Sequence, residues 1–308
     1  MGMELLKLIE GIRSPFLDTV IGLITRLGEE TIGVVILCAI FWCISKRIAY
    51  VIGVAYFLSG LTVQGMKICF RIDRPWVADP TLRPVPSALA YSTGYSFPSG
   101  HTQSAAALFG ALGAQVKQRW LMIVCFILPV LVAFSRMYLG VHTLLDVVTS
   151  LIISFLLIFL TVKIFAGEKI EKKREFIIAL FMVLYAVVVV VIAAVLFSNG
   201  TIEHNYIADC LKAAGAGIGF AVGMFVERVY IDFSVKTKSI HLQVVKFILG
   251  FFGVLAIKEG LKPIIGTGLT ADMVRYFLML TWVTVFYPLI IKRFFSVKAS
   301  ESGADAAR

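Results

Sequence analysis

The chain has 308 residues, of which 59% are hydrophobic and only 16% are charged, and its formal net charge is +10. Its mean hydropathy is +0.91, and its hydrophobic content exceeds the roughly 45–50% of soluble domains. This composition excludes an ordinary soluble protein and indicates a multi-pass membrane protein. Because lysine and arginine accumulate in the cytoplasmic loops of such proteins, the positive charge does not imply a nucleic-acid partner, and we expect none.

The first 30 residues predict an amphipathic segment that lies in the membrane interface, or a re-entrant hairpin. Their apolar run covers residues 15–25 and is interrupted by Asp18. It is too short and too charged for a span of about 20 residues.

Nine further apolar runs predict transmembrane helices. They cover residues 31–45, 50–66, 101–116, 120–139, 146–166, 176–197, 207–231, 244–261 and 273–291. A helix satisfies its backbone hydrogen bonds internally, which a membrane-spanning segment requires. We therefore predict an all-α fold, a polytopic transmembrane helical bundle of about nine spans with an N-terminal interfacial or re-entrant helix.

The distribution of basic residues over the predicted loops sets the orientation. Loops on one side carry pairs of them: Lys46 with Arg47, Lys117 with Arg119, and Lys236 with Lys238. The positive-inside rule assigns this side to the cytoplasm, and the opposite loops 198–206 and 263–272 contain no lysine or arginine. The segment 67–100 is then extracytoplasmic although it is basic, which suggests that its cations have a function.

Three distant points of the chain meet at one membrane face in this arrangement. The second span ends near Lys67, the third begins near His101, and the link between the fourth and fifth runs from Arg136 to Asp146. Ionisable residues are costly in so apolar a chain, so their gathering at one face marks a candidate site.

His142 and Asp146 are four residues apart, which would place them on one face of a helix that begins near Gly140. A carboxylate there can hold the imidazole in one tautomer and raise the nucleophilicity of its far nitrogen. A polar pair that faces water at a helix start is the alternative interpretation.

The stretch Pro98-Ser99-Gly100-His101 precedes the third span. Its proline and glycine favour a turn, and Ser99 is suited to be the N-cap of the following helix. Free backbone N–H groups at a helix N-terminus bind anions. A cap followed by an interfacial histidine would have the same sequence.

Three cations accompany the two histidines: Lys67, Arg74 and Arg136. Singly, each could extend from an apolar surface toward water, but together they indicate a doubly or triply charged anion such as phosphate. A zinc site built from His101, His142 and Asp146 has suitable ligand types. The neighbouring cations would repel the metal, however, so we expect no metal and no cofactor.

These residues form the pattern K-x6-RP, PSGH and SR-x5-H-x3-D, in which eleven positions are specified. They are Lys67, Arg74, Pro75, Pro98, Ser99, Gly100, His101, Ser135, Arg136, His142 and Asp146. The pattern resembles the three-part signature of the type-2 phosphatidic acid phosphatase and vanadium haloperoxidase superfamily. The resemblance covers residues 31–166 and leaves the rest of the chain without an account.

The resemblance implies a role for each residue. His142 would attack phosphorus and form a phosphohistidine, Asp146 would orient it, and His101 would protonate the leaving oxygen and then activate water. The phosphoryl oxygens would be bound by Lys67, Arg74, Ser99, Gly100 and Arg136. The haloperoxidase relatives hold vanadate in this pocket and are soluble, so the predicted spans favour the branch of integral-membrane lipid phosphatases.

We divide the chain into an N-terminal segment (1–30), a phosphatase core (31–166) and a C-terminal extension with four spans (167–308). In the extension, Gly215, Gly219 and Gly223 form two overlapping GxxxG steps that suit close helix packing. We prefer packing within the chain and keep a homodimer as the alternative.

The sequence thus predicts a hydrolase of the cell membrane that removes phosphate from a lipid phosphomonoester or diphosphate at the extracytoplasmic face. Phosphatidic acid, phosphatidylglycerol phosphate, a polyprenyl diphosphate and a sphingoid phosphate all fit. Two alternatives stay open: a phosphotransferase that passes the phosphoryl group from His142 to a lipid or sugar hydroxyl, and a transporter or scaffold with a vestigial site. The complete set of motifs weighs against a vestigial site.

Overall fold

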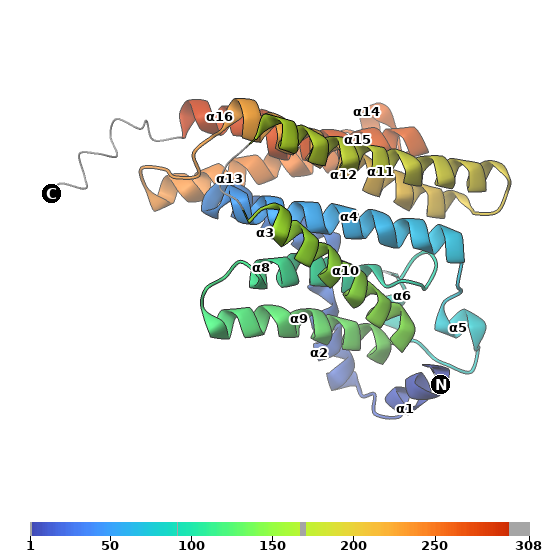
Figure 1. Cartoon of the computed structure of the whole chain (residues 1–308). Coiled ribbons are helices and arrows are strands. Elements are labelled where there is room, and N and C mark those ends of the chain that lie inside the picture. The colour runs from blue at the N-terminus through green and yellow to red at the C-terminus, as the bar shows by residue number, and fades with distance from the viewer. Residues whose placement is uncertain (1, 91, 167–170, 296–308) are drawn as a thin grey trace. The chain divides into compact units, whose positions relative to one another are not determined.

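The computed structural model of the chain describes residues 2–90, 92–166 and 171–295 (Figure 1). These residues form helices and loops and contain no strand, which confirms the predicted all-α fold. Up to residue 166 the helices are α1 (Gly2–Glu10), α2 (Pro15–Arg26), α3 (Glu30–Ala39), η1 (Ile40–Ile44), α4 (Lys46–Phe70), α5 (Pro75–Ala78), α6 (Pro86–Leu89), α7 (Gly100–Ala105), η2 (Ala106–Gly110), α8 (Ala111–Gly113), α9 (Arg119–Tyr138) and α10 (Leu144–Ile164). From residue 171 they are α11 (Lys172–Ser198), α12 (His204–Val226), η3 (Glu227–Ile231), α13 (Ile240–Leu255), η4 (Ala256–Gly260), α14 (Lys262–Ile265), α15 (Leu269–Thr281), η5 (Trp282–Phe286) and α16 (Tyr287–Phe294). The η segments are short stretches of π-helix.

Within the described residues, seven helical stretches are long and apolar enough to cross a membrane. They are Lys46–Ala78, Arg119–Tyr138, Leu144–Ile164, Lys172–Ser198, His204–Ile231, Ile240–Ile265 and Leu269–Phe294. The pair Pro15–Arg26 and Glu30–Ile44, bent by 47°, adds an eighth if it is one span. The predicted run 101–116 forms α7, η2 and α8, which end at Gly113 and are shorter than these spans. The architecture is that of the predicted polytopic bundle.

The spanning helices expose large apolar side chains. On α10, Leu145 is 63% exposed and Ile152 is 62% exposed, and Leu156 and Phe159 are more than half exposed as well. Such a surface is stable against lipid chains and unfavourable in water. The outward faces therefore agree with a multi-pass membrane protein.

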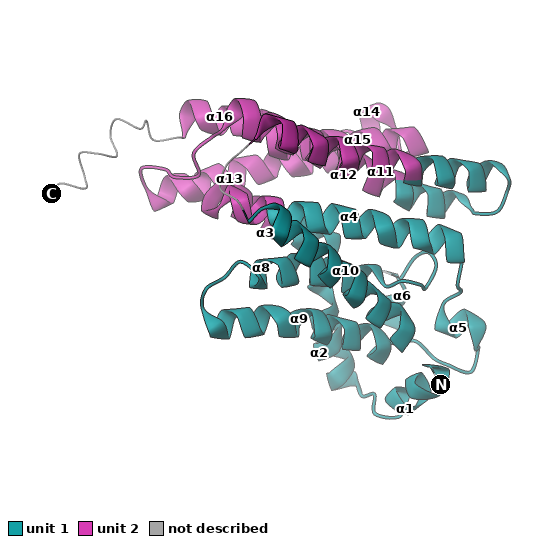
Figure 2. Ribbon diagram, viewed as in Figure 1, with its two compact units in different colours: residues 1–34, 51–166, 189–210 teal, residues 35–50, 167–188, 211–308 magenta. Residues whose placement is uncertain are grey.

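The chain folds into two compact units that alternate along the sequence (Figure 2). Unit 1 consists of residues 1–34, 51–166 and 189–210, and unit 2 consists of residues 35–50, 167–188 and 211–308. The predicted boundary between core and extension adjoins residues 167–170, which lie outside the described residues, and it stays a prediction. All eight predicted site residues belong to unit 1.

In unit 1, the N-terminal segment forms two helices rather than an unstructured tail. Ser14 caps α2 by accepting a hydrogen bond from the Leu17 backbone at 3.3 Å, with proline at the first helical position. α1 buries Ile9 in an apolar cluster with the end of α9, while its Leu8 is 73% exposed. One buried and one exposed apolar face is the pattern expected of an interfacial helix.

In unit 2, the three glycines of the GxxxG steps lie directly against α15 and η5. A methyl group on Gly219 would lie 2.5 Å from the carbonyl oxygen of Phe277, and methyl groups on Gly215 and Gly223 would be closer still to their neighbours. The glycines thus permit close packing within the chain, as preferred from the sequence. A homodimer stays a prediction.

Candidate active site

The predicted site residues come from five helix ends in unit 1. Lys67 lies in the last turn of α4, Arg74 precedes α5, Ser99 caps α7, Gly100 and His101 begin α7, Arg136 lies in the last turn of α9, His142 precedes α10, and Asp146 lies in its first turn. The folding of unit 1 brings these ends together, although the residues are spread over 80 positions of sequence.

His142 and Asp146 are in contact, but the prediction that they share one helix face was wrong. α10 begins at Leu144, so His142 precedes the helix. Thr143 caps α10, and its backbone N–H donates to Oδ2 of Asp146 at 2.8 Å. This reciprocal capping box turns the carboxylate back toward His142, whose Nδ1 lies 3.3 Å from Oδ2. The cap, rather than helical periodicity, creates the pair.

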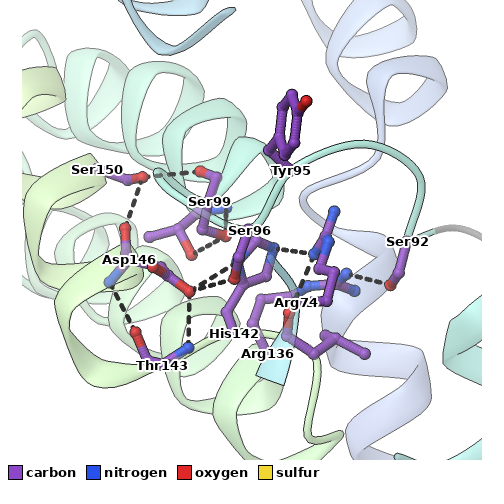
Figure 3. A network of polar contacts seen from close by, with 12 residues as sticks. Arg74, Ser92, Tyr95, Ser96, Ser99, Arg136, His142, Thr143, Asp146 and Ser150 are labelled. Carbon is purple, nitrogen blue, oxygen red and sulfur yellow. Dashed lines mark hydrogen bonds and ion pairs between the residues drawn. The ribbon is translucent and has the colours of Figure 1, made fainter. Parts of the chain in front are cut away.

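The far nitrogen of His142 faces a cation. Nη1 of Arg74 donates a hydrogen bond to Nε2 of His142 at 2.8 Å (Figure 3). Because a guanidinium only donates, Nε2 is the unprotonated nitrogen and Nδ1 carries the proton that faces Asp146.

Burial lowers the pKa of His142 well below its ordinary value, and nearby positive charges add to this effect. In decreasing order, these charges belong to Arg74, Arg136, Lys67 and His101. The imidazole therefore stays neutral at neutral pH, and the lone pair of its Nε2 is directed at Arg74. This is the state that a histidine nucleophile requires.

Two of the three predicted cations bind the backbone of one loop. Nζ of Lys67 donates to the carbonyl of Tyr95 at 2.7 Å. Arg74 donates from Nε to the carbonyl of Gly94 at 2.9 Å and from Nη2 to the carbonyl of Thr93 at 2.6 Å. We call residues 92–96 the carbonyl loop.

Arg136 also binds the carbonyl loop, but its partner there is a side chain and not a backbone carbonyl. It donates to the hydroxyl of Ser92 at 2.9 Å and to that of Thr25 at 3.0 Å, while its Nε is buried without a partner among the described residues.

All three cations are buried: Lys67 is 9% exposed, Arg74 6% and Arg136 1%. Their hydrogen bonds within the described part of the chain all go to neutral groups. Three buried positive charges held by neutral partners favour an anion with more than one charge.

The start of α7 forms another side of the site. Ser99 accepts a hydrogen bond from the Thr102 backbone at 3.4 Å, which confirms it as the N-cap. A methyl group on Gly100 would meet no atom within 4 Å. Nε2 of His101 is buried and has no hydrogen-bond partner among the residues that the structure describes. Contact of Ser99 and Gly100 with phosphate stays a prediction.

Two groups of residues that contact the candidate site escaped sequence reasoning. Ser96 donates from its hydroxyl to Oδ2 of Asp146 at 2.6 Å, next to the predicted PSGH stretch. In the predicted N-terminal segment, Thr25 binds Arg136, and Gly28 packs so closely on His101 that an added methyl group would lie 2.5 Å from its carbonyl oxygen. A hydroxyl two residues before Pro98 was the visible signal for Ser96, whereas nothing in the sequence marked Thr25 or Gly28.

No group of three His, Cys, Asp or Glu side chains that could hold a metal ion occurs among the described residues. The carboxylate of Asp146 contacts His142, and the charges of Arg74, Arg136 and Lys67 act on this histidine.

The helices are those of a membrane protein, and its histidine–aspartate pair lies in a site with three buried cations. This arrangement defines the class of integral-membrane enzymes that act on anionic esters. Residues 48–171 match the family model described as the PAP2 superfamily, and residues 211–300 match the model described as PAP2 superfamily phosphatase, transmembrane extension. The chain belongs to the PAP2 superfamily, which confirms the resemblance found in the sequence motifs. It is a membrane-bound hydrolase of phosphoric esters.

Two curated relatives support this assignment. The chain is 30% identical over 182 residues to phosphatidylglycerophosphatase B of Bacillus subtilis, covering 53% of this chain and 82% of the relative. It is 28% identical over 181 residues to undecaprenyl-diphosphatase of Sulfolobus acidocaldarius, covering 56% and 82%.

Two crystal structures are also similar. LpxE of Aquifex aeolicus matches with a TM-score of 0.44 and 24% identity, over 53% of this chain and 94% of that one. A transmembrane PAP2-type phosphatidylglycerolphosphate phosphatase from Bacillus subtilis matches with a TM-score of 0.46 and 25% identity, over 54% and 85%.

Proposed function

We propose that this protein removes phosphate from a lipid phosphomonoester or diphosphate at the extracytoplasmic face of the cell membrane, through a phosphohistidine and without a metal. The observation that carries the proposal is the set of three buried cations whose charges act on His142, one of which, Arg74, contacts its Nε2. All three are bound to neutral groups. A phosphate dianion would supply the negative charge that these partners lack.

In the first step, Nε2 of His142 attacks phosphorus and the bond from phosphorus to the lipid oxygen breaks. Burial and the nearby cations lower the pKa of His101, and the negative charge of the bound phosphate opposes this effect and lets His101 carry a proton. His101 gives this proton to the lipid oxygen, and the lipid alcohol leaves. The electrons of the new P–N bond come from the lone pair that Arg74 contacts at 2.8 Å. Substrate binding therefore requires the Arg74 guanidinium to exchange this nitrogen for a phosphoryl oxygen.

In the second step, His101 removes a proton from water, and the oxygen attacks phosphorus as the P–N bond breaks. Inorganic phosphate leaves, and His142 regains its lone pair. The proton on Nδ1 of His142 stays in contact with Asp146 throughout, and the carboxylate stabilises the positive charge of the phosphorylated ring. Lys67, Arg74 and Arg136 stabilise the charge of the phosphoryl oxygens in both transition states.

The names of the relatives narrow the substrate class to membrane lipids that carry a phosphate or a diphosphate. One relative is named for phosphatidylglycerol phosphate and the other for undecaprenyl diphosphate. Both chemistries present a terminal phosphate to the same cations. We therefore propose a lipid phosphate substrate and include both in the test, together with phosphatidic acid.

The test uses the purified full-length chain in detergent with these three lipids. We expect phosphate release that persists in EDTA, is blocked by orthovanadate and is lost in His142→Ala. The control is His241→Ala, which replaces an exposed histidine and should keep wild-type turnover.

In a rapid quench with labelled substrate, His101→Ala should accumulate an acid-labile phosphoryl-enzyme. Unchanged turnover in His142→Ala would exclude the nucleophile, and loss of turnover in EDTA that is restored by a divalent metal would exclude the metal-independent route.

A further inference from the structure

The carbonyl loop is held from outside by a residue of α12. The rings of Tyr95 and Tyr206 are stacked, with centroids 4.0 Å apart and planes inclined by 8°. Tyr206 lies in the first turn of α12, in the part of that helix that belongs to unit 1. In Figure 3 the ring of Tyr95 points away from the polar network, whereas the hydroxyls of Ser92 and Ser96 take part in it. The stack therefore contacts the loop on the side opposite to His142 and Asp146.

Tyr206 also covers the residue before Tyr95. A methyl group on Gly94 would lie 3.7 Å from the Tyr206 ring, so the ring borders the space beside Gly94. Gly94 has a φ of +72°, in the left-handed region that glycine adopts without strain. The ring thus stacks on Tyr95 and lies beside Gly94.

The carbonyls of these two residues hold two of the cations. Gly94 accepts from Nε of Arg74 at 2.9 Å, and Tyr95 accepts from Nζ of Lys67 at 2.7 Å. Arg74 in turn contacts Nε2 of His142 at 2.8 Å. A movement of the loop would therefore displace both cations relative to the nucleophile.

The start of α12 is fixed in unit 1 by a second contact. Sγ of Cys210, which is fully buried, lies 3.9 Å from the carbonyl oxygen of Gln64 on α4. Gln64 stands one turn before Lys67 on the same helix. Tyr206 is thus anchored to the helix that carries one of the cations it influences.

We propose that Tyr206 is a positioning residue of the phosphate site, which fixes the carbonyl loop through Tyr95 and so sets the positions of Lys67 and Arg74. The inference rests on the proposed function, because it gives those cations the phosphate to bind. Tyr206 lies outside both matched segments, 48–171 and 211–300, so the link between them completes the active site.

The test measures inhibition by orthovanadate and the kinetic constants for a lipid phosphate, with the full chain in detergent. In Tyr206→Ala, we expect the vanadate inhibition constant and KM to rise about threefold to tenfold. This range is the loss of affinity that corresponds to the stabilisation by one aromatic pair. Tyr206→Phe keeps the stack and should restore wild-type values. The control is Phe197→Ala, which removes another aromatic contact of the same segment, its edge contact with His204, without touching the carbonyl loop.

A double-mutant cycle separates positioning from general stability. Tyr95→Ala should have the same effect as Tyr206→Ala, and the double variant should be no worse than either, because both remove one stack. Additive effects, or equal losses in Tyr206→Ala and Phe197→Ala, would overturn the inference. If Tyr206→Ala does not fold, Tyr206→Leu fills the space without stacking and is measured in its place. Wild-type constants in the Tyr206 variants alongside an inactive His142→Ala would overturn the inference and leave the proposed function intact.

Discussion

At the scale of single residues, the carboxylate of Asp146 is held in place by a side-chain hydroxyl and a backbone N–H. One of its oxygens, Oδ2, accepts from the Ser96 hydroxyl at 2.6 Å and from the Thr143 backbone at 2.8 Å, and it faces His142 at 3.3 Å. Asp146 itself is 2% exposed. Its direction is therefore set by two donors that take no part in the chemistry, and the imidazole is oriented through them.

Replacing Ser96 by alanine should lower kcat and leave KM within about twofold. A hydrogen bond to a charged group contributes about 1.5–3 kcal/mol, so kcat should fall about tenfold to hundredfold. The measurement is steady-state phosphate release with a lipid phosphate. Ser87→Ala replaces an exposed serine of the same segment, residues 67–100, and should behave as wild type. A loss that appears only in KM would contradict a role through Asp146.

The lowered pKa of His142 predicts a loss of stability as the pH falls. The unfolded imidazole takes up a proton at its ordinary pKa of about 6.5, whereas the buried ring does not, so acid favours the unfolded state below that value. The slope from this one group reaches at most about 1.4 kcal/mol per pH unit. His142→Asn should flatten the decline of the apparent Tm between about pH 7 and pH 5. The exposed His241→Asn should keep the wild-type slope, and an equal slope in both variants would contradict the prediction.

Sequence reasoning singled out the residues proposed to react because their motif is specific, but it could not find the groups that hold them. The charges of Lys67, Arg74 and Arg136 are unusual in an apolar chain and therefore visible. Main-chain carbonyls are present at every residue and carry no sequence signal, so the carbonyl loop could only be found in the structure.

At the scale of helices, the junction of α2 and α3 is an unforeseen part of the site. The N-terminal segment was predicted to be an interfacial helix or a re-entrant hairpin, and no contact with the site was predicted for it. In the structure, the Thr25 hydroxyl at the end of α2 accepts a hydrogen bond from Arg136, and Gly28 packs against His101. The contact joins segments more than 70 residues apart in sequence. Periodicity describes each helix singly and cannot show which distant helix it will touch, which explains the omission.

Gly28→Ala should therefore damage the site and Gly22→Ala should not. A methyl group on Gly28 would lie 2.5 Å from the carbonyl oxygen of His101 and 3.0 Å from its Cβ, whereas one on Gly22 would meet no atom within 4 Å. Overpacking against backbone costs about 1–3 kcal/mol. A displacement of His101 by about 1 Å can cost about hundredfold in kcat. Thermal unfolding and phosphate release measure the two effects. Equal activity in both variants would contradict the prediction, because it would show that the backbone at the junction of α2 and α3 can shift without moving His101.

At the scale of the whole chain, the apolar outward faces and the distribution of basic residues carry the topology. The spans themselves could be read from the sequence, because burial in lipid demands long apolar runs. The orientation rests on the positive-inside rule, and the basic segment 67–100 is its exception. In unit 1 that exception now has a physical account, since Lys67 and Arg74 are buried in the site and do not belong to a loop in water.

The topology can be tested with two single cysteines in a chain whose five native cysteines have been replaced. Ser87 and Lys117 are both exposed, and the predicted third span separates them. Ser87→Cys should react with a membrane-impermeant maleimide in intact cells, and Lys117→Cys should react only after the membrane is opened. Both variants must keep phosphatase activity for the result to describe the native arrangement. The reverse pattern would move the site to the cytoplasmic face and with it the leaflet from which the lipid phosphate enters. Labelling of both in intact cells would show that the segment between Ser87 and Lys117 does not cross the membrane. In that case α7, η2 and α8 would form a re-entrant element that supports His101 from one side.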